Sequence, residues 1–290
     1  MFQSLKQRIR DFLKYHFYIL KVRNRFSPAV QVAQRHLFHY YRDLAAAGRT
    51  PALKDTGFSV FTQFEEDGIL LFLFATLGTA NKTFIEIGSD DGVNSNCANL
   101  VLNFGWHGLF IDGNERSVRR GRHFYSKYPT HWAYPPKFAC TMITRENINR
   151  VIEEEGFTGE VDFLCIDIDG NDYWIWYALE VVRPRVVMIE THVEFGYNNI
   201  VVPYDPGYVY PGRHKDYHGA SPVAMNRLAN KKGYRLVGAN SYGFNTIYVR
   251  NDIGQDLLPE VSVESILQHP SAIDSFRVFE AVRDYPYVEG

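Results

Sequence analysis

The chain has 290 residues, of which 46% are hydrophobic, and its formal net charge is -2. This length and hydrophobic content suffice for one substantial α/β domain with additions, and they exclude bulk disorder. A net charge so close to zero gives the whole molecule no electrostatic attraction for nucleic acid, and we expect none as a partner.

The first fifty residues are much more basic than the rest of the chain. They hold ten lysines and arginines against only two acids, Asp11 and Asp43. Apolar residues such as Phe12 and Leu13 interleave with these bases at roughly helical spacing, which predicts a basic helical arm over residues 1–57. Such an arm suits the anionic surface of a membrane, or packing onto the domain as a lid or as a contact within a homo-oligomer.

Neither secretion nor a membrane span is predicted. The apolar run at 15–20 is too short to cross a bilayer, is flanked by Lys14 and Lys21, and has no cleavage site after it. Three cysteines without a metal-type pair are expected to be reduced core residues: Cys97, Cys140 and Cys165. These features predict a cytoplasmic protein, with or without peripheral attachment at the inner face of the membrane.

The stretch 83–114 has the order of parts that holds a nucleoside: a strand, a turn, a helix and a second strand. Gly88 and Gly92 bracket the turn, where the backbone approaches a ligand closely or adopts dihedrals that a β-carbon forbids. The helix is expected to start near Asn94 or Ser95, since both are good N-caps. The second strand ends in an acid about twenty residues beyond the turn, which places a carboxylate where it can accept both hydroxyls of a ribose.

The residues of the turn indicate which kind of nucleoside the chain binds. A dinucleotide-binding turn needs a glycine at its middle position, but Asp90 stands there with Asp91 beside it. Two carboxylates repel a pyrophosphate, which disfavours an NAD-dependent oxidoreductase, and they are compatible with the cationic sulfonium of S-adenosylmethionine (SAM). The alternative is an ordinary strand, turn and helix whose acids cap the helix.

Further strands and helices alternate along the chain. A helix over 61–74 leads into the strand at 84–87. After the strand at 109–112, further strands are expected near 137–142, at 161–167 and at 186–190, and the last two are continuous apolar runs typical of a parallel sheet covered on both faces. A helix begins at Ser221 and Pro222 and stops at Gly233, and an antiparallel pair follows at 234–237 and 246–249.

Four ionisable residues gather where the strands at 161–167 and 186–190 end. Asp167 and Asp169 are two apart, as are Glu190 and His192, so each pair points one way from extended backbone. Three interpretations stay open. The residues bind a divalent cation such as Mg²⁺ or Mn²⁺, they form a metal-free site with Asp167 near the sulfonium and His192 as general base, or some acids only cap the next helix.

A long aromatic segment, residues 193–220, follows these acids and contains six tyrosines and phenylalanines together with several bases. A loop of this length inside a compact domain is usually functional. Its tyrosines offer flat faces to a sugar or base, or they simply pack the loop onto the body of the domain.

Four motifs together resemble the FkbM-like branch of class I SAM-dependent methyltransferases, and bacterial relatives found with surface-polysaccharide genes in particular. The motifs are EIGSDDG with Asn94 and Ser95, FIDGN, DFLCIDIDGNDYWIW and VVMIETH. The resemblance covers residues 58–250 and leaves 251–290 as a C-terminal extension. It implies a Rossmann-like class I methyltransferase fold, an α/β fold with a seven-stranded, mostly parallel sheet and an antiparallel final strand.

The resemblance also implies roles for particular residues. Glu86, Gly88 and Gly92 shape the SAM pocket, Asp112 holds the ribose, and Thr141 or Met142 flanks the adenine. The same turn contributes Asp90, Asn94 and Ser95, and Asp167 lies near the methionine moiety. Thr191 and His192 depart from many relatives, which puts the proton-transfer group in doubt.

The sequence therefore predicts a SAM-dependent O-methyltransferase for a hydroxyl of a sugar or surface-glycan intermediate. Asp167 and His192 are the expected catalytic residues, and Asp167, Asp169, Glu190 and His192 the expected ligands of a divalent cation. Two alternatives stay open: an idle module that binds SAM, a membrane or a partner protein, and an NAD-dependent oxidoreductase.

Overall fold

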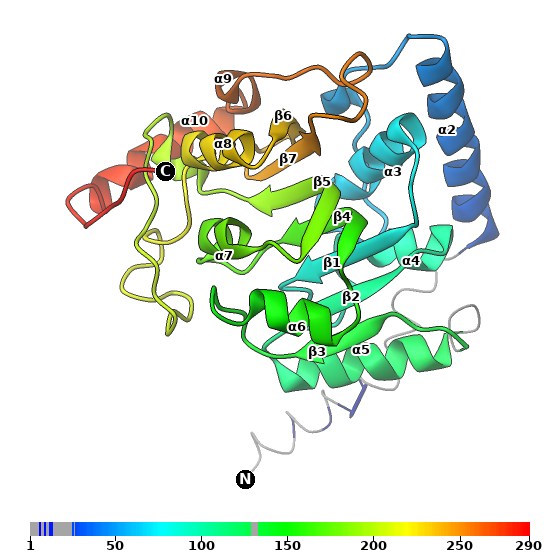
Figure 1. Cartoon of the computed structure of the whole chain (residues 1–290), viewed down its shortest axis with the longest axis horizontal. Helices are drawn as coiled ribbons and strands as arrows, with labels where there is room; N and C mark the ends of the chain where they lie inside the picture. Colours follow the sequence, from blue (N-terminus) through cyan, green and yellow to red (C-terminus); the bar gives the residue numbers. More distant parts are fainter. Residues whose placement is uncertain (1–5, 7–8, 10–11, 14–24, 26, 129–132) are drawn as a thin grey trace.

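The computed structural model describes residues 6, 9, 12, 13, 25, 27–128 and 133–290 (Figure 1). A single seven-stranded sheet organises these residues. From one edge to the other its strands are β3 Lys137–Cys140, β2 His107–Asp112, β1 Thr83–Ile87, β4 Gly159–Ile166, β5 Val182–Glu190, β7 Asn245–Arg250 and β6 Tyr234–Ala239.

The sheet is parallel apart from one strand. β7 runs antiparallel to both of its neighbours, β5 and β6, and the other six strands of the sheet share one direction. β1 lies next to the middle strand β4, with Ile85 beside Leu109 of β2 and Leu164 of β4. This strand order is that of the Rossmann-like class I methyltransferase fold, so the predicted fold class is confirmed.

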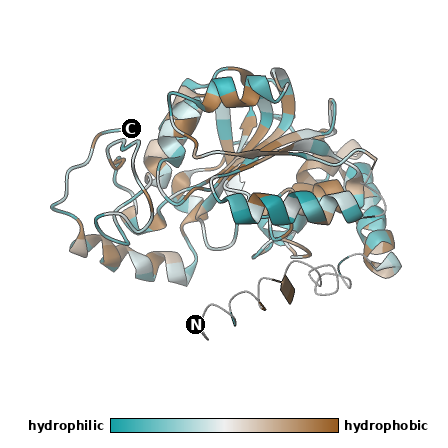
Figure 2. Ribbon diagram, turned by 90° about the horizontal axis from the view of Figure 1, so that it is seen from below, coloured by the Kyte–Doolittle hydropathy of each residue, from teal (hydrophilic) through white to brown (hydrophobic). Residues whose placement is uncertain are grey.

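Helices cover both faces of the sheet (Figure 1). One face packs against α3 Glu66–Leu77, α4 Ala98–Phe104 and α5 Glu115–Lys127, and the other against α6 Ile148–Glu154, α7 Asp172–Ala178 and α8 Pro222–Lys231. Neighbouring residues of a strand contribute to opposite layers, as Phe84 and Ile85 of β1 do. In Figure 2 apolar colour runs along the strands, and the outer helices show mixed faces.

The helix expected over 61–74 begins later, at Glu66. The carboxylate of Asp67 accepts hydrogen bonds from the backbone amides of Val60, Phe61 and Thr62, which holds these residues in a turn. A helix through Phe61 would lose these bonds, so the buried carboxylate sets the helix start. Burial raises the pKa of Asp67 to about 6.

The predicted N-terminal helix is confirmed for α2 Pro28–Ala46, which is capped by Ser27. This helix packs on the body of the domain, because Tyr41 meets Phe72 of α3 edge to face at 5.1 Å, and Gln34 and Ala45 are buried. Most of residues 1–26 lie outside the described residues, so the membrane role and the boundary at residue 57 stay predictions.

The C-terminal residues build a second layer of structure beside the long aromatic segment. They form α9 Val263–Ile266, α10 Pro270–Ser275 and the 3-10 helix η4 Phe276–Ala281. Two shorter 3-10 helices lie elsewhere in the chain, η2 Leu53–Asp55 and η3 Val193–Phe195. Val201 pairs with both Ala220 and Val288 through isolated bridges. Figure 1 accordingly shows the segment 196–221 and the C-terminus on the same side of the molecule, beyond the carboxyl ends of the strands.

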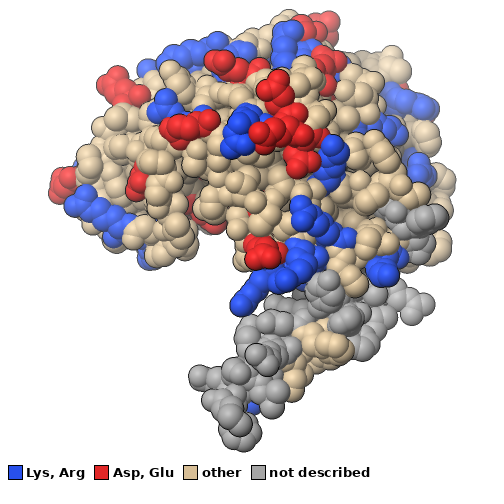
Figure 3. All heavy atoms as spheres, turned by 60° about the horizontal axis from the view of Figure 1, so that its bottom comes forward, with Lys and Arg blue, Asp and Glu red and all other residues tan. Residues whose placement is uncertain are grey.

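Three smaller expectations have mixed outcomes. Cys97 and Cys165 are buried free cysteines as predicted, but Cys140 is exposed, because it ends the edge strand β3. In the described part of the chain no helix has the length and hydropathy needed to cross a bilayer. On the face shown in Figure 3, basic and acidic side chains are interspersed.

Candidate cofactor and active site

A cavity of about 510 Å³ lies at the carboxyl ends of β1, β2 and β4. In a parallel sheet this edge is where ligands bind, and the volume is within the range of small-molecule sites. Six predicted cofactor residues line it: Gly88, Asp90, Asp112, Thr141, Met142 and Asp167. The other four predicted residues, Glu86, Gly92, Asn94 and Ser95, are not part of its wall.

The turn after β1 requires a glycine at position 88, because the backbone there passes close to the end of β4. Gly88 has φ +88°, and a β-carbon there would lie 1.7 Å from the carbonyl oxygen of Asp167. Asp90, two residues later, also adopts a positive φ of 48°. The turn therefore lies tight against the end of β4, with Asp90 on the cavity wall.

Glu86 has a structural role behind this turn. Its carboxylate is buried and accepts hydrogen bonds from the Ser95 hydroxyl at 2.8 Å and from the amides of Asn96 and Cys97 at 3.0 Å each. Helix α4 consequently begins at Ala98 and not at the predicted Asn94 or Ser95. Burial raises the pKa of Glu86, although these hydrogen bonds oppose the rise.

This arrangement also decides what can bind at the start of α4. In dinucleotide-binding folds the amides at this helix start bind the pyrophosphate. Here the Glu86 carboxylate, behind the cavity wall, already accepts hydrogen bonds from the amides of the two residues that precede α4. These two amides are therefore not free to bind a pyrophosphate.

Asp112 ends β2 and faces the cavity. One of its carboxylate oxygens accepts the Asp90 amide at 2.8 Å, and the other accepts the Asn114 amide at 2.7 Å. A carboxylate can accept about four hydrogen bonds, so each oxygen keeps a lone pair for a ligand hydroxyl. Burial raises the pKa of Asp112, while these amides oppose the rise.

The sequence interpretation treated the two acids of the turn as unpaired charges, but both are paired in the structure. Arg120 of α5 forms ion pairs with both, at 2.6 Å to Asp91 and 3.2 Å to Asp90. Asp91 is buried and lies outside the cavity wall. Repulsion of a pyrophosphate by these two acids is therefore weaker than expected, and the Glu86 carboxylate is the stronger argument.

Thr141 and Met142 follow β3 on the adjacent wall. The Thr141 amide donates to the backbone oxygen of Asp112, which fixes this loop beside the end of β2. Met142 is 59% exposed, and its sulfur packs over Gly113, where a β-carbon would lie only 2.0 Å from it. A flat apolar group in the cavity would find the Met142 side chain next to the Asp112 carboxylate.

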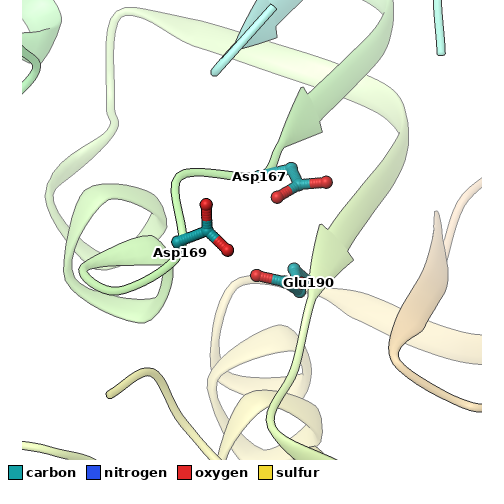
Figure 4. Close-up of side chains that lie close together, drawn as sticks. All are labelled: Asp167, Asp169 and Glu190. Atoms are coloured by element: carbon teal, nitrogen blue, oxygen red, sulfur yellow. The ribbon is translucent and has the colours of Figure 1, made fainter. Parts of the chain in front are cut away.

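Three carboxylates converge beside the cavity, as Figure 4 shows. Asp167 and Asp169 come from the turn after β4 and Glu190 from the end of β5, and they offer oxygens within 4.8 Å of one another. This confirms that the two strand ends are neighbours and brings together three of the four predicted metal ligands. We refer to Asp167, Asp169 and Glu190 as the acidic triad.

Burial and mutual repulsion dominate the electrostatics of this triad. Burial, followed by the charges of Asp172 and Asp169, raises the pKa of Asp167 to about 8. Burial and the charge of Asp167 raise the pKa of Glu190 well above its usual value. Clustered acids with raised pKa values are a common mark of a functional site, because a bound cation would relieve the repulsion.

Asp172 belongs to the turn and not to the triad. Its two oxygens accept the amides of Ile168 and Gly170, each at 2.9 Å. These bonds close the turn before α7, and neither Asp172 nor the N-cap residue Asn171 caps the helix through its side chain, so the capping role that the sequence left open is not what these acids do. The turn so formed gives Asp169 a positive φ of 53° and directs its carboxylate toward the triad.

His192 lies apart from the triad in this structure. Its Nε2 is 3.1 Å from the backbone oxygen of Asp216, and its Nδ1 is 3.3 Å from the Glu194 carboxylate. Burial lowers the pKa of His192 to about 4. Because a carbonyl can only accept, Nε2 carries the proton, and both ring nitrogens face protein atoms. The ring does not line the cavity.

Arg120 was not singled out from the sequence, because it carries no local signal on a helix rich in arginines. Glu86 was predicted to shape the pocket, but it lies behind the turn and not on the cavity wall. Tyr208 lines the cavity from the long aromatic segment, so a tyrosine-rich loop was the signal that could have found it.

No protein-family model and no curated protein matches this sequence. Some solved structures resemble it distantly. The O-methyltransferase from Bacillus cereus in complex with S-adenosylhomocysteine (SAH) shares 17% identity at a TM-score of 0.42, covering 73% of this chain and 88% of that one. Magnesium protoporphyrin IX methyltransferase from Synechocystis PCC 6803, with bound SAM, shares 13% identity at 0.40, covering 64% and 77%. Likeness at this level carries no argument about function.

Proposed function

We propose that this chain is a SAM-dependent O-methyltransferase of the FkbM-like kind, acting on a hydroxyl of a sugar or surface-glycan intermediate. The four sequence motifs and the strand order support the methyltransferase assignment. The acceptor class rests on the resemblance and on the tyrosine-rich segment that borders the cavity.

One observation carries the proposal: the cavity presents a carboxylate suited to a ribose, and two amides just before α4 are already bound to a buried carboxylate. Asp112 keeps free lone pairs at the end of β2, and Glu86 already accepts the amides at the start of α4. An adenosine group bound to Asp112 would extend along the turn from Gly88 toward Asp167, which suits a sulfonium better than a pyrophosphate.

Catalysis then requires mainly that the acceptor oxygen is aligned with the methyl group of SAM. The acceptor oxygen attacks the methyl carbon, the carbon to sulfur bond breaks, and SAH leaves as a neutral thioether. The methyl group of a sulfonium is already activated, so holding the oxygen in line with it supplies much of the rate. The hydroxyl proton is the remaining product, and Asp169, the most exposed acid of the triad, is placed to accept it.

The triad fits a divalent cation. Carboxylate oxygens are the ligands that Mg²⁺ and Mn²⁺ prefer, and oxygens within 4.8 Å of one another can surround one ion at about 2.1 Å with small side-chain movements. A bound cation would polarise the acceptor hydroxyl and lower its pKa. His192 is outside this ligand set as placed, and we therefore assign the ligands to Asp167, Asp169 and Glu190.

The remaining expectations belong to the same proposal. The protein works in the cytoplasm, and the basic arm brings it to an anionic membrane surface. The arm could instead serve a homo-oligomer, and vesicle binding distinguishes the two roles.

Transfer of radiolabelled methyl from SAM tests the proposal. The purified full chain should label a polar glycan fraction in the presence of Mg²⁺ or Mn²⁺, and label should be lost in the Asp167→Ala variant. SAM binding without any transfer, to any fraction, would favour an idle binding module. Binding of NAD in place of SAM would favour an oxidoreductase.

A further inference from the structure

A second cavity of about 450 Å³ adjoins the cofactor cavity. The two share Asn171 and Tyr208 in their walls, so they meet at the turn after β4. The second cavity is otherwise built by the long aromatic segment and by Pro286 of the C-terminal extension. The hydroxyl of Tyr217 donates to the backbone oxygen of Pro286, which ties these two parts together.

Tyr208 lies at the boundary between the two cavities, and its ring packs against a glycine on each of two sides. A β-carbon at Gly170 would lie 2.3 Å from the ring, and one at Gly212 would lie 2.4 Å from it. Gly212 also has φ +59°, which L side chains rarely adopt. Two glycines from different parts of the chain thus leave room for this ring and fix where its hydroxyl points.

That hydroxyl is buried and has no hydrogen-bond partner among the residues that the structure describes. Leaving such a group unpaired costs about 1 to 3 kcal/mol, so a ligand hydroxyl that reaches it would gain by pairing with it. Burial and then the charge of Asp169 raise the pKa of Tyr208 to about 12, so the hydroxyl keeps its proton at neutral pH. It can therefore both donate and accept a hydrogen bond.

We propose that the second cavity is the acceptor site, that it takes a neutral sugar ring, and that the Tyr208 hydroxyl positions the reacting sugar hydroxyl at the boundary with the cofactor cavity. This inference rests on the proposed methyl transfer. It adds the place of the acceptor, its charge and the residue that aligns it.

The wall chemistry is that of a site for a polyhydroxylated ring. Tyr204 and Tyr217 supply aromatic surface, and Asp205 and Arg213 supply a carboxylate and a guanidinium for sugar hydroxyls. The Arg213 guanidinium lies 4.7 Å from the Tyr285 ring centre.

Charge argues against an anionic ring. Within the cavity the negative charge of Asp205 offsets the positive charge of Arg213. Burial lowers the pKa of His218 to about 4, so this imidazole is neutral. Beyond Tyr208 lies the acidic triad. A uronate would therefore meet more negative than positive charge, whereas a neutral ring meets donors and acceptors only.

Binding is tested with methyl glycosides of D-glucose, D-galactose and D-mannose and with the matching uronates. Saturation-transfer NMR on the full chain, with and without SAH, should show binding of at least one neutral glycoside and weaker binding of its uronate. Arg213→Gln should reduce that binding at least fivefold. The inference is overturned if no neutral glycoside binds, if uronates bind better, or if Arg213→Gln leaves binding unchanged.

Turnover tests the positioning role. With the bound glycoside as acceptor, Tyr208→Phe should lower kcat about tenfold and change KM less than twofold, since it removes one hydrogen bond. Tyr210→Phe is the matched control, because Tyr210 is exposed on the same segment and lines neither cavity. Equal kcat in Tyr208→Phe and wild type, or no transfer to any bound glycoside, would overturn the inference. Absence of SAH binding would instead reject the proposed function, because glycoside binding is read without SAH as well.

Discussion

Replacing Asp167 by asparagine should stabilise the ligand-free protein at alkaline pH. An aspartate in the unfolded chain loses its proton near pH 4, whereas burial and neighbouring charges hold the pKa of Asp167 at about 8 in the folded state. Between these values the folded state binds more protons than the unfolded state. The free energy of unfolding of the wild type therefore falls as pH rises through this window.

The size of this effect follows from the raised pKa. One group loses at most about 1.4 kcal/mol per pH unit, and the slope halves at pH 8, so between pH 6.5 and 8 the loss is about 1.5 kcal/mol. His192 and His218, whose pKa values are lowered to about 4 in the folded state, act in the opposite direction between about pH 4 and 6.5. They remain in the variant, so the difference between variant and wild type reports the Asp167 carboxylate together with its effect on the neighbouring acids Glu190 and Asp172.

Thermal unfolding followed by circular dichroism in excess chelator measures that difference. From pH 6.5 to pH 8, the wild type should lose about 3 to 6 °C in Tm relative to Asp167→Asn. Asp274→Asn, an exposed acid on α10, serves as control and should follow the wild type. Parallel pH profiles of Asp167→Asn and wild type would refute the raised pKa and the repulsion within the triad.

Three further predictions concern other parts of the molecule. Chelation should abolish methyl transfer and Mg²⁺ or Mn²⁺ restore it, and full activity in excess chelator would favour a metal-free site. Gly88→Ala should destabilise the fold by several degrees in thermal unfolding, since its β-carbon would overlap the Asp167 carbonyl, and an unchanged Tm would contradict the tight turn. Deleting residues 1–26 should preserve SAH binding in calorimetry but remove salt-sensitive sedimentation with anionic vesicles, whereas deletion through residue 50 should also destabilise the domain by uncovering Phe72. If the intact chain never sediments with vesicles, the arm has another role.

The sheet and the triad could be predicted from sequence because both follow from local patterns. Apolar runs that end in acids identified β4 and β5, and their side-by-side position follows from their parallel order. Asp167, Asp169 and Glu190 then had to meet at one edge. Ser221 as a helix cap is a similarly local signal, and its side chain does accept the Ala224 amide.

Long-range partners account for what the sequence could not show. The start of α4 depends on Glu86, twelve residues earlier, and the charge of the turn depends on Arg120, about thirty residues later. His192 looked like part of the acidic triad because it is two residues beyond Glu190. The hydrogen bond of its ring to the Asp216 carbonyl and its contact with Glu194 come from the fold of the long segment, which no local pattern encodes.

Calorimetric titration with SAH and, in parallel, with NAD tests the central claim most directly. We predict that the wild type binds SAH and not NAD, and that Asp112→Ala weakens SAH binding at least tenfold, because two hydrogen bonds to a charged acceptor are lost. NAD binding in the wild type, or SAH affinity unchanged in Asp112→Ala, would contradict a SAM site at the end of β2.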